Sequence, residues 1–442
     1  MINTRQAYAG GRPVYICDGN RTPFLKAQGR PGPFRAADLA VAAGKALLAR
    51  QPFPPQTLDE VILGCVSPGP DEVNIARLVA LRLGCGKRVP AWTVQRNCGS
   101  GMQAIDSAAT DIAFGRADLV LAGGTETMSH APVLLPPQSV ELLSAWLQAR
   151  GSGERLRLLA RIRPAHFKLV FGLLQGLTDP IVSLSMGQTA EILAKRFAVS
   201  REQMDTFAVE SHQRLARAQD EGWLGEIDPL YSPDGTVYDH DDGVRRDSSV
   251  ERLARLKAAF DRPYGLVTAG NSAQVSDGAA LLILASEDAV RQYRLPVLGR
   301  IVDCHWAGVD PEQMGLGPVH AMAPILLRQG LTTQDIDYWE INEAFAAQVL
   351  ACQAAWRSDE YARTELGLEQ AFAPIDPLRL NLDGGAVACG HPVGASGARI
   401  VLHLLQILKR SGSHRGMAAL CIGGGQGGAM LLERSQEAGH ER

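Results

Sequence analysis

The stretch VPAWTVQRNCGSGMQAIDSAATDIAFGRADLVLAGGTETMS (89–129) decides the fold of the N-terminal part of this chain. Residues 89–97 contain the β-branched and aromatic side chains typical of a strand. Residues 98–115 are rich in Gly, Ala and Ser and predict a helix that packs closely against its neighbours. Residues 117–129 predict a buried strand that ends on glycines. A strand, a helix and a strand in this order indicate α/β layering.

The C-terminal part repeats this pattern. In LNLDGGAVACGHPVGASGARIVLHLLQIL (380–408), glycines lead into a second small-residue helix, and MAALCIGGGQGGAMLLE (417–433) predicts a strand, a glycine turn and a strand. Cys98 precedes Gly123 by 25 residues, and His391 precedes Gly423 by 32. We interpret this as a weak internal duplication, in which two α/β halves face each other across one site.

Composition excludes several classes of protein. The chain has 442 residues, which predicts two or three domains or one layered body with an inserted piece, and 44 Lys and Arg against 47 Asp and Glu give a net charge of −3. Without a basic excess, a nucleic-acid partner is not expected. The sequence contains no apolar run of membrane-spanning length, and residues 1–13 lack the apolar core of a signal peptide, so we expect a cytoplasmic location.

The eight cysteines are expected to be free thiols. They include no C-x-x-C pair, which leaves a structural zinc site without local support and gives no expectation of a metal. Most should be buried small apolar residues. The question is therefore which one or two of these thiols are reactive.

Three segments contain side chains suited to catalysis. Cys98 begins a helix, where free N–H groups are expected to lower the pKa of a thiol; the alternative is a structural cysteine at a tight turn. His391 lies in a Gly/Pro-rich turn, and an imidazole with a pKa near neutrality can activate a thiol; the alternative is an ordinary loop histidine. Cys421 ends a strand before a glycine turn whose N–H groups, near Gly423, could bind an oxyanion.

Taken together, these segments resemble the thiolase family. The blocks NCGSGMQA, NEAFAAQ, GHPVGASGAR and CIGGGQGGA resemble its nucleophile, asparagine, histidine and second-cysteine blocks, in order, and the resemblance extends from about residue 13 to residue 433. It implies the thiolase fold, with two similar α/β/α/β/α halves in five layers and an inserted loop domain. The implied boundaries are 1–130 with 259–289 for the N-terminal half, 131–258 for the inserted loop domain over the active site, and 290–442 for the C-terminal half.

The resemblance also implies a mechanism. Thiolases cleave a 3-ketoacyl-CoA with free CoA, or condense two acyl-CoA molecules in reverse. Cys98 would be the nucleophile, and His391 would take its proton. Cys421 would serve as the acid and base for the acetyl-CoA α-carbon, and Asn342 would hold a water beside His391. Backbone N–H groups near Cys98 and Gly423 would form a second oxyanion site, with CoA as a substrate and no cofactor.

The residues that would contact CoA are implied by the same resemblance. Arg245 would lie near the adenosine phosphates, with Arg246 as the alternative, and Met186 would line the pocket. Ser272 precedes Ala273, a position where the family often has serine, so the pantetheine contact is open. Ordinary packing is the alternative for these residues. The family also implies a homodimer or a dimer of dimers.

One basic segment bears on which members of the thiolase family the chain resembles. Residues 146–175 contain six Arg or Lys and one Glu, a net charge of +5, interleaved with leucines. Together with SMGQTAEILAKRF (185–197) and ESHQRLARA (210–218), this segment resembles the β-subunit of the fatty-acid β-oxidation trifunctional complex. Residues 146–175 by themselves predict a basic amphipathic hairpin that docks an α-subunit or an anionic membrane surface; a lid packed on its own body is the alternative.

The expected function is a 3-ketoacyl-CoA thiolase of fatty-acid β-oxidation. Asn342 replaces a histidine often found in the β-oxidation subunits and is typical of general and biosynthetic thiolases. A biosynthetic acetyl-CoA acetyltransferase is therefore one alternative. A non-catalytic thiolase-fold scaffold subunit is a second alternative, from another functional class.

Overall fold

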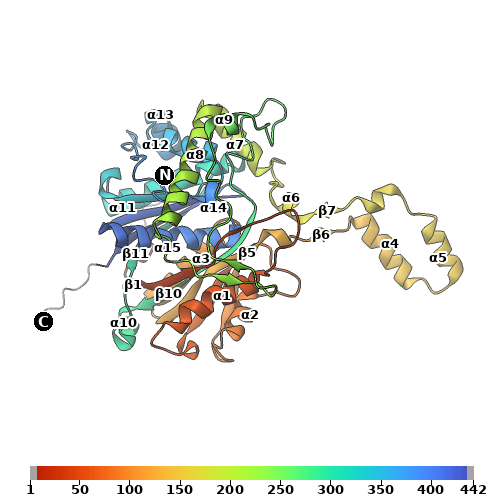
Figure 1. The fold of residues 1–442 in the computed structure, drawn as a ribbon, viewed down its shortest axis with the longest axis horizontal. Helices are drawn as coiled ribbons and strands as arrows, with labels where there is room; N and C mark the ends of the chain where they lie inside the picture. Colours follow the sequence, from red (N-terminus) through yellow and green to blue (C-terminus); the bar gives the residue numbers. More distant parts are fainter. Residues whose placement is uncertain (1–6, 436–442) are drawn as a thin grey trace.

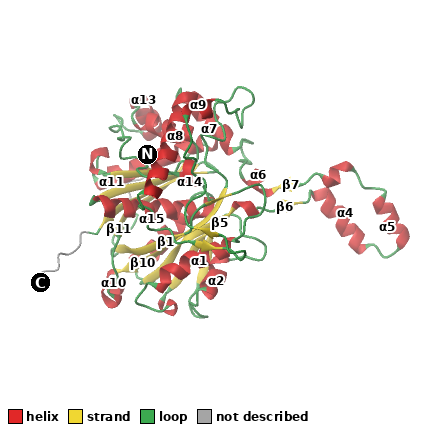
Figure 2. Cartoon of the chain, viewed as in Figure 1, coloured by secondary structure: helices red, strands yellow, loops and turns green. Residues whose placement is uncertain are grey.

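The computed structural model describes residues 7–435, and in this range ten strands join into one sheet (Figures 1 and 2). The order across the sheet is β12-β13-β14-β11-β1-β10-β5-β3-β4, with the short β2 on β10. The strands are β1 (Val14–Arg21), β2 (Leu25–Lys26), β3 (Glu60–Gly64), β4 (Ala91–Val94), β5 (Leu119–Thr127), β10 (Ser276–Ser286), β11 (Gly299–Gly308), β12 (Tyr338–Ile341), β13 (Arg415–Ile422) and β14 (Gln426–Arg434).

The strands and helices form five layers. Helices α3 (Ser100–Ala113) and α15 (Val393–Ser411) lie in the middle and contact each other, and α15 contacts strands of both halves of the chain. Helices α1 (Ala36–Ala49) and α2 (Ile75–Arg82) cover the outer face of the N-terminal strands. Helices α11 (Gly317–Gln329) and α12 (Ala346–Trp356) lie on the C-terminal side. The predicted α/β layering is confirmed, because both small-residue stretches form the central helices.

Glycines bring the starts of the two central helices together. A Cβ atom on Gly124 of β5 would lie 1.9 Å from the carbonyl oxygen of Gly394, and one on Gly101 would lie 2.8 Å from the same atom. No larger residue fits at either position without moving a backbone. Gly101 follows Cys98 by three residues and Gly394 follows His391 by three, so this contact places both motifs at one end of the central layer.

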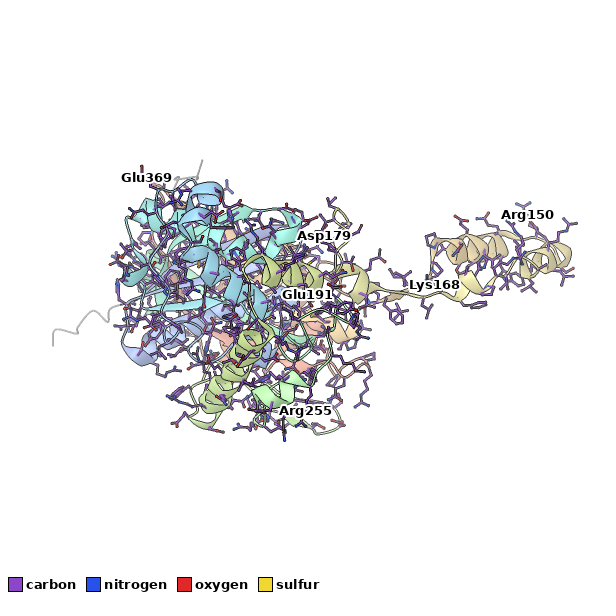
Figure 3. The ribbon with its side chains drawn as sticks, turned by 90° about the horizontal axis from the view of Figure 1, so that it is seen from above. Arg150, Lys168, Asp179, Glu191, Arg255 and Glu369 are labelled. Atoms are coloured by element: carbon purple, nitrogen blue, oxygen red, sulfur yellow. The ribbon has the colours of Figure 1, made fainter. Side chains whose placement is uncertain are left out.

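The segment between β5 and β10 contains a long projecting arm. It begins and ends with the paired strands β6 (Val133–Leu134) and β7 (Val170–Phe171), and its tip consists of α4 (Pro137–Gln148) and α5 (Ser152–Leu159) (Figures 1 and 3). The predicted hairpin therefore exists but begins about ten residues before 146. A lid packed on its own body is wrong, because the arm extends away from the layers.

The remaining elements surround the layers. They are α6 (Gly172–Gly176), α7 (Met186–Arg196), α8 (Arg201–Asp220), β8 (Leu230–Tyr231), β9 (Val237–Tyr238), α9 (Val250–Ala254), α10 (Glu287–Tyr293), α13 (Asp359–Tyr361) and α14 (Ala386–Cys389), with short single turns between them. Nowhere in residues 7–435 is there a helix both long and apolar enough to span a bilayer. The expectation about a signal peptide rests partly on residues 1–6, which lie outside the described range.

Candidate active site

Cys98 lies on a tight loop between β4 and α3. Asn97 before it has a φ of 43°, in the left-handed region that asparagine tolerates better than most residues. The Asn97 carbonyl accepts hydrogen bonds from the Ser100 backbone (3.0 Å) and hydroxyl (2.7 Å). The Asn97 side-chain amide donates to the Gly423 carbonyl at 2.8 Å. The nucleophile loop is therefore bound directly to the glycine turn of the other half.

The pKa of Cys98 differs from the sequence-based expectation. Burial raises the pKa of this thiol, although the backbone N–H groups of Gly423 and of Cys98 itself lower it in part. The expectation of a lowered pKa is wrong for the free protein, because loss of water outweighs these donors. All eight cysteines are free, as expected, and Cys98 alone among them is only half-buried. The resting nucleophile is a neutral thiol that a substrate can reach.

Cys421 is the second-last residue of β13, and Gly423 begins the turn that leads into β14. Gly424 and Gly425 have φ values of 89° and 75°, which side chains other than glycine rarely adopt. The pKa of the Cys421 thiol lies well above its usual value, first because of burial and then because of the nearby Cys98. The two thiols are thus close enough to interact electrostatically, and Cys421 holds its proton more tightly than an exposed cysteine does.

His391 is positioned by the first turn of α15. Its Nδ1 lies 2.7 Å from the Ser396 hydroxyl, which donates to the Pro392 carbonyl at 3.0 Å. Because the single hydroxyl proton is used on Pro392, Ser396 accepts a hydrogen bond from Nδ1–H, and this arrangement leaves Nε2 as the basic nitrogen.

The pKa of His391 also corrects the sequence analysis. Burial lowers the pKa to about 4, and Arg399 adds to the shift. The expected value near neutrality is wrong, because the ring is shielded from water and lies near a guanidinium. His391 is consequently a neutral imidazole at physiological pH, ready to accept a proton.

Asn342 follows strand β12 and is buried. Its backbone N–H donates to the Ala419 carbonyl of β13 at 2.9 Å, and its side-chain nitrogen lies 3.5 Å from each ring nitrogen of His391. Among the described residues, the side-chain oxygen of Asn342 is a buried atom without a hydrogen-bond partner. The structure therefore brings Asn342 and His391 together and leaves a polar atom free for a ligand.

The three expected CoA contacts occupy different places. A Cβ on Gly423 would lie 3.2 Å from the sulfur of Met186, so Met186 is at the glycine turn. Ser272 is buried, and its hydroxyl donates to the Thr268 carbonyl at 2.7 Å. Arg246 is paired with Asp220 at 2.8 Å, whereas the Arg245 guanidinium makes no ion pair within residues 7–435. Of the two arginines, Arg245 is the one available to a phosphate.

A cavity of about 310 Å³ opens at the nucleophile. Part of its wall is formed by Cys98, Asn97, Met186 and Gly423. Most of the rest comes from the end of β5, from the loop after β3 and from the base of the arm, with one residue directly after β4 and one at the start of α15. The residues that line it are Val66, Ser67, Gln95, Asn97, Cys98, Glu126, Met128, Ala131, Gly172, Leu173, Gly176, Leu177, Thr178, Asp179, Pro180, Met186, Val393, Gly423 and Gly424. Neither Arg245 nor Ser272 contributes to it. The cavity thus extends from Cys98 toward the arm.

Comparison with known proteins identifies the family. The models of the N-terminal and C-terminal thiolase domains match residues 14–288 and 295–434. The chain belongs to the thiolase family. It is therefore an acyltransferase, and its layered structure is the thiolase fold.

Individual relatives match this thiolase over nearly its whole length. It is 40% identical to a beta-ketoadipyl-CoA thiolase of Pseudomonas aeruginosa, over 96% of this chain and 99% of that protein. It is 35% identical to a 3-ketoacyl-CoA thiolase of Yersinia pestis, over 96% and 97%. The crystal structure of human mitochondrial 3-ketoacyl-CoA thiolase in complex with CoA matches with a TM-score of 0.81 and 36% identity, over 96% of this chain and 98% of that one. The Bacillus anthracis acetyl-CoA acetyltransferase also has a TM-score of 0.81 and 36% identity, over 96% and 99%.

Sequence reasoning missed three residues that position the site of this thiolase. Asn97 binds the nucleophile loop to Gly423, and Ser396 orients His391. Glu126 accepts hydrogen bonds from the N–H groups of Val66, Ser67 and Gly394, and so joins β5 to the start of α15. Asn97 and Ser396 lie inside motifs quoted for the resemblance, and Glu126 lies in the stretch 89–129 that decides the fold. In each case the available signal was a polar residue within a Gly-rich apolar segment.

Proposed function

We propose that this thiolase cleaves 3-ketoacyl-CoA with CoA, giving acetyl-CoA and an acyl-CoA two carbons shorter. The observation that carries the proposal is the cavity lined by the half-buried Cys98 and by Gly423. His391, Asn342 and Cys421 do not line it, but the Gly101–Gly394 contact places the His391 motif at the same end of the central layer. A thiol in the wall of a cavity, with a second thiol close to it and a neutral imidazole at the same end of the central layer, suits transfer of an acyl group through a cysteine thioester.

In the first half-reaction, His391 removes the thiol proton of Cys98 as the sulfur attacks the 3-keto carbon. The bond between C2 and C3 breaks, the acyl group stays on Cys98, and the electron pair forms the enolate of acetyl-CoA. Cys421 gives its proton to C2 and acetyl-CoA leaves. The high pKa of Cys421 suits this role, because the thiol keeps its proton until a strong base such as an enolate needs it.

In the second half-reaction, the Cys421 thiolate takes the proton of a new CoA thiol, and the CoA sulfur attacks the acyl-Cys98 thioester. The bond between the Cys98 sulfur and the acyl carbon breaks, the acyl-CoA leaves, and His391 returns its proton to the Cys98 sulfur. Asn342 would hold a water that, with His391, stabilises the thioester oxygen of the acetyl-CoA enolate in the first half-reaction. The N–H groups at Cys98 and Gly423 would donate to the carbonyl oxygen of the acyl-Cys98 thioester. CoA enters as a substrate. Its phosphates would lie near Arg245, and its pantetheine arm would lie near Ser272 and Met186. Only protons and an acyl group move, so the steps require no metal or redox cofactor.

The size of the cavity favours chains longer than acetyl. A volume of about 310 Å³ exceeds what the two carbons of an acetyl group need, and most of its lining is apolar. This supports degradation of medium or longer 3-ketoacyl-CoA, as in fatty-acid β-oxidation, over synthesis of acetoacetyl-CoA. Rates with acetoacetyl-CoA and with 3-ketoacyl-CoAs of increasing length would test this preference.

Mass spectrometry tests the enzymatic role itself. After incubation with a 3-ketoacyl-CoA and no free CoA, an acyl adduct is expected on Cys98 in the wild type. The Cys98→Ala variant should form no adduct and show no turnover. A wild-type protein that forms no adduct would instead support a non-catalytic thiolase-fold scaffold.

The arm supports a second proposal, that the hairpin docks on an anionic membrane surface. Leu147, Leu156 and Phe167 are 74%, 69% and 71% exposed, and the segment 146–175 carries a net charge of +5. Basic side chains attract acidic lipid headgroups, and exposed leucines can enter the interface. Flotation with vesicles of acidic lipid should recover the wild type, and a variant lacking residues 146–163 should stay behind. Equal flotation of both would contradict the proposal, and capture of an α-subunit by the arm would favour the protein partner.

We also propose a homodimer that forms through strand β4. This strand is at one end of the sheet, directly before the nucleophile loop, and Trp92 on it is partly exposed. Edge strands pair readily with a second copy. Light scattering should give the mass of a dimer or of a dimer of dimers. The Ala91→Pro variant removes a backbone N–H from the edge of β4, so its mass should shift toward that of the monomer.

A further inference from the structure

The cavity at Cys98 has an unusual electrostatic composition for a site that binds anionic CoA esters. Its wall contains two acidic residues, Glu126 and Asp179, and no Lys, Arg or His. Neither carboxylate is paired with a cation within residues 7–435. Asp179 is buried where the arm joins the layers (Figure 3), and its Oδ1 accepts from the N–H groups of Ile181 (2.8 Å) and Val182 (3.2 Å).

Glu126, on β5, is held in the cavity wall by backbone hydrogen bonds. Its two oxygens accept hydrogen bonds from Val66 (2.8 Å), Ser67 (3.0 Å) and Gly394 (3.1 Å), so it cannot rotate away from the cavity without losing three backbone partners. Burial raises the pKa of Glu126 to about 7. At pH 8 Glu126 is therefore mostly ionised, and Asp179 is the second acidic residue of the wall.

We infer that this cavity receives the acyl chain and selects chains with an uncharged end, and that Asp179 and Glu126 exclude acyl chains that end in a carboxylate. The inference rests on the proposed function, because it takes Cys98 as the residue that holds the acyl group. A terminal carboxylate would lose water, find no cationic partner in the wall and approach two groups of its own charge. An alkyl end has none of these costs.

The two kinds of substrate differ in the acyl group that thiolysis would leave on Cys98. A 3-ketoadipyl chain leaves a succinyl group on the nucleophile, and a 3-ketohexanoyl chain leaves a butyryl group. These acyl groups have the same number of carbons and differ only in the terminal carboxylate. The beta-ketoadipyl-CoA thiolase is the relative with the higher identity, yet the cavity favours the uncharged substrate.

The test compares kcat/KM of the full-length protein for 3-ketohexanoyl-CoA and 3-ketoadipyl-CoA at pH 8. We expect a preference of at least about 100-fold for the uncharged chain, since a buried carboxylate without a partner is costly. Equal values would overturn the inference and leave the proposed function intact. Cleavage of neither substrate would overturn the proposed function, and the inference with it.

Three variants test the mechanism of selection. Asp179→Asn removes the carboxylate and keeps a side-chain oxygen that accepts the hydrogen bond from the Ile181 N–H. Thr178→Arg adds a cation to the cavity wall. Each variant should reduce the preference for 3-ketohexanoyl-CoA by about tenfold. Gln175→Arg is the matched control, because Gln175 is exposed on the same segment and does not line the cavity. An unchanged preference in Asp179→Asn and Thr178→Arg, or an equal change in the control, would show that these side chains do not select the chain.

Discussion

The hydrogen bond between Ser396 and His391 offers a sharp test of how the base is oriented. In Ser396→Ala, the Nδ1–H of a buried imidazole loses its acceptor at 2.7 Å. An unsatisfied buried donor costs about 1–3 kcal/mol, and His391 can recover part of this by changing tautomer or rotating. Either change moves the basic Nε2 away from its position. At about 1.4 kcal/mol for each factor of ten, kcat for thiolysis should fall roughly 10- to 100-fold, with KM nearly unchanged.

The matched control lies on the same helix. Ser411 donates to the carbonyl four residues before it at 2.8 Å, as Ser396 does at 3.0 Å, but it contacts no histidine. Ser411→Ala should keep wild-type kcat, and thermal melting should show both variants folded. A Ser396→Ala protein within about twofold of the wild-type kcat would refute the role given to this hydrogen bond.

Three further predictions concern the thiols, the pH profile and the fold. Cys421→Ala should still form the acyl adduct on Cys98, measured by rapid-quench mass spectrometry, while its steady-state turnover falls by about 100-fold or more. Cys389→Ala should keep its steady-state rate, because Cys389 is a buried apolar contact. A strong loss of activity in Cys389→Ala would mean that the wrong thiols were chosen. Because its pKa is about 4, His391 stays neutral until the pH falls toward that value. The value of kcat/KM at pH 5.5 should therefore remain within about twofold of its value at pH 7. A tenfold fall would contradict this protonation state of His391. The buried His403 ring lies 2.8 Å from the Glu226 carboxylate, and its pKa is raised to about 10. His403→Gln removes this positive charge from beside a buried carboxylate, so the free energy of unfolding measured in urea should fall by about 3 kcal/mol. An unchanged urea midpoint would contradict the charged pair.

Much of the fold could be predicted because its signals are local. The small-residue stretches after Cys98 and His391 form the central helices, and the glycines after Cys421 form the turn between β13 and β14. The proposed domain boundaries, including the inserted loop domain at 131–258, stay a prediction. The hairpin was expected from its charge and leucines, but its projection from the body was not, because a sequence pattern does not say which surface an amphipathic helix covers.

In the candidate site, too, some features could be predicted from the sequence and others depend on the tertiary structure. Residue types and order along the chain determined that a thiol, an imidazole and a glycine turn would be available, since each depends on its immediate neighbours. Their protonation was decided by tertiary structure: burial raises the pKa of Cys98 and lowers that of His391, and burial depends on layers contributed by distant segments. The same holds for the acidic wall, in which Glu126 and Asp179 come from different elements. Desolvation and charge proximity depend on distances in space, and only the packed chain sets those.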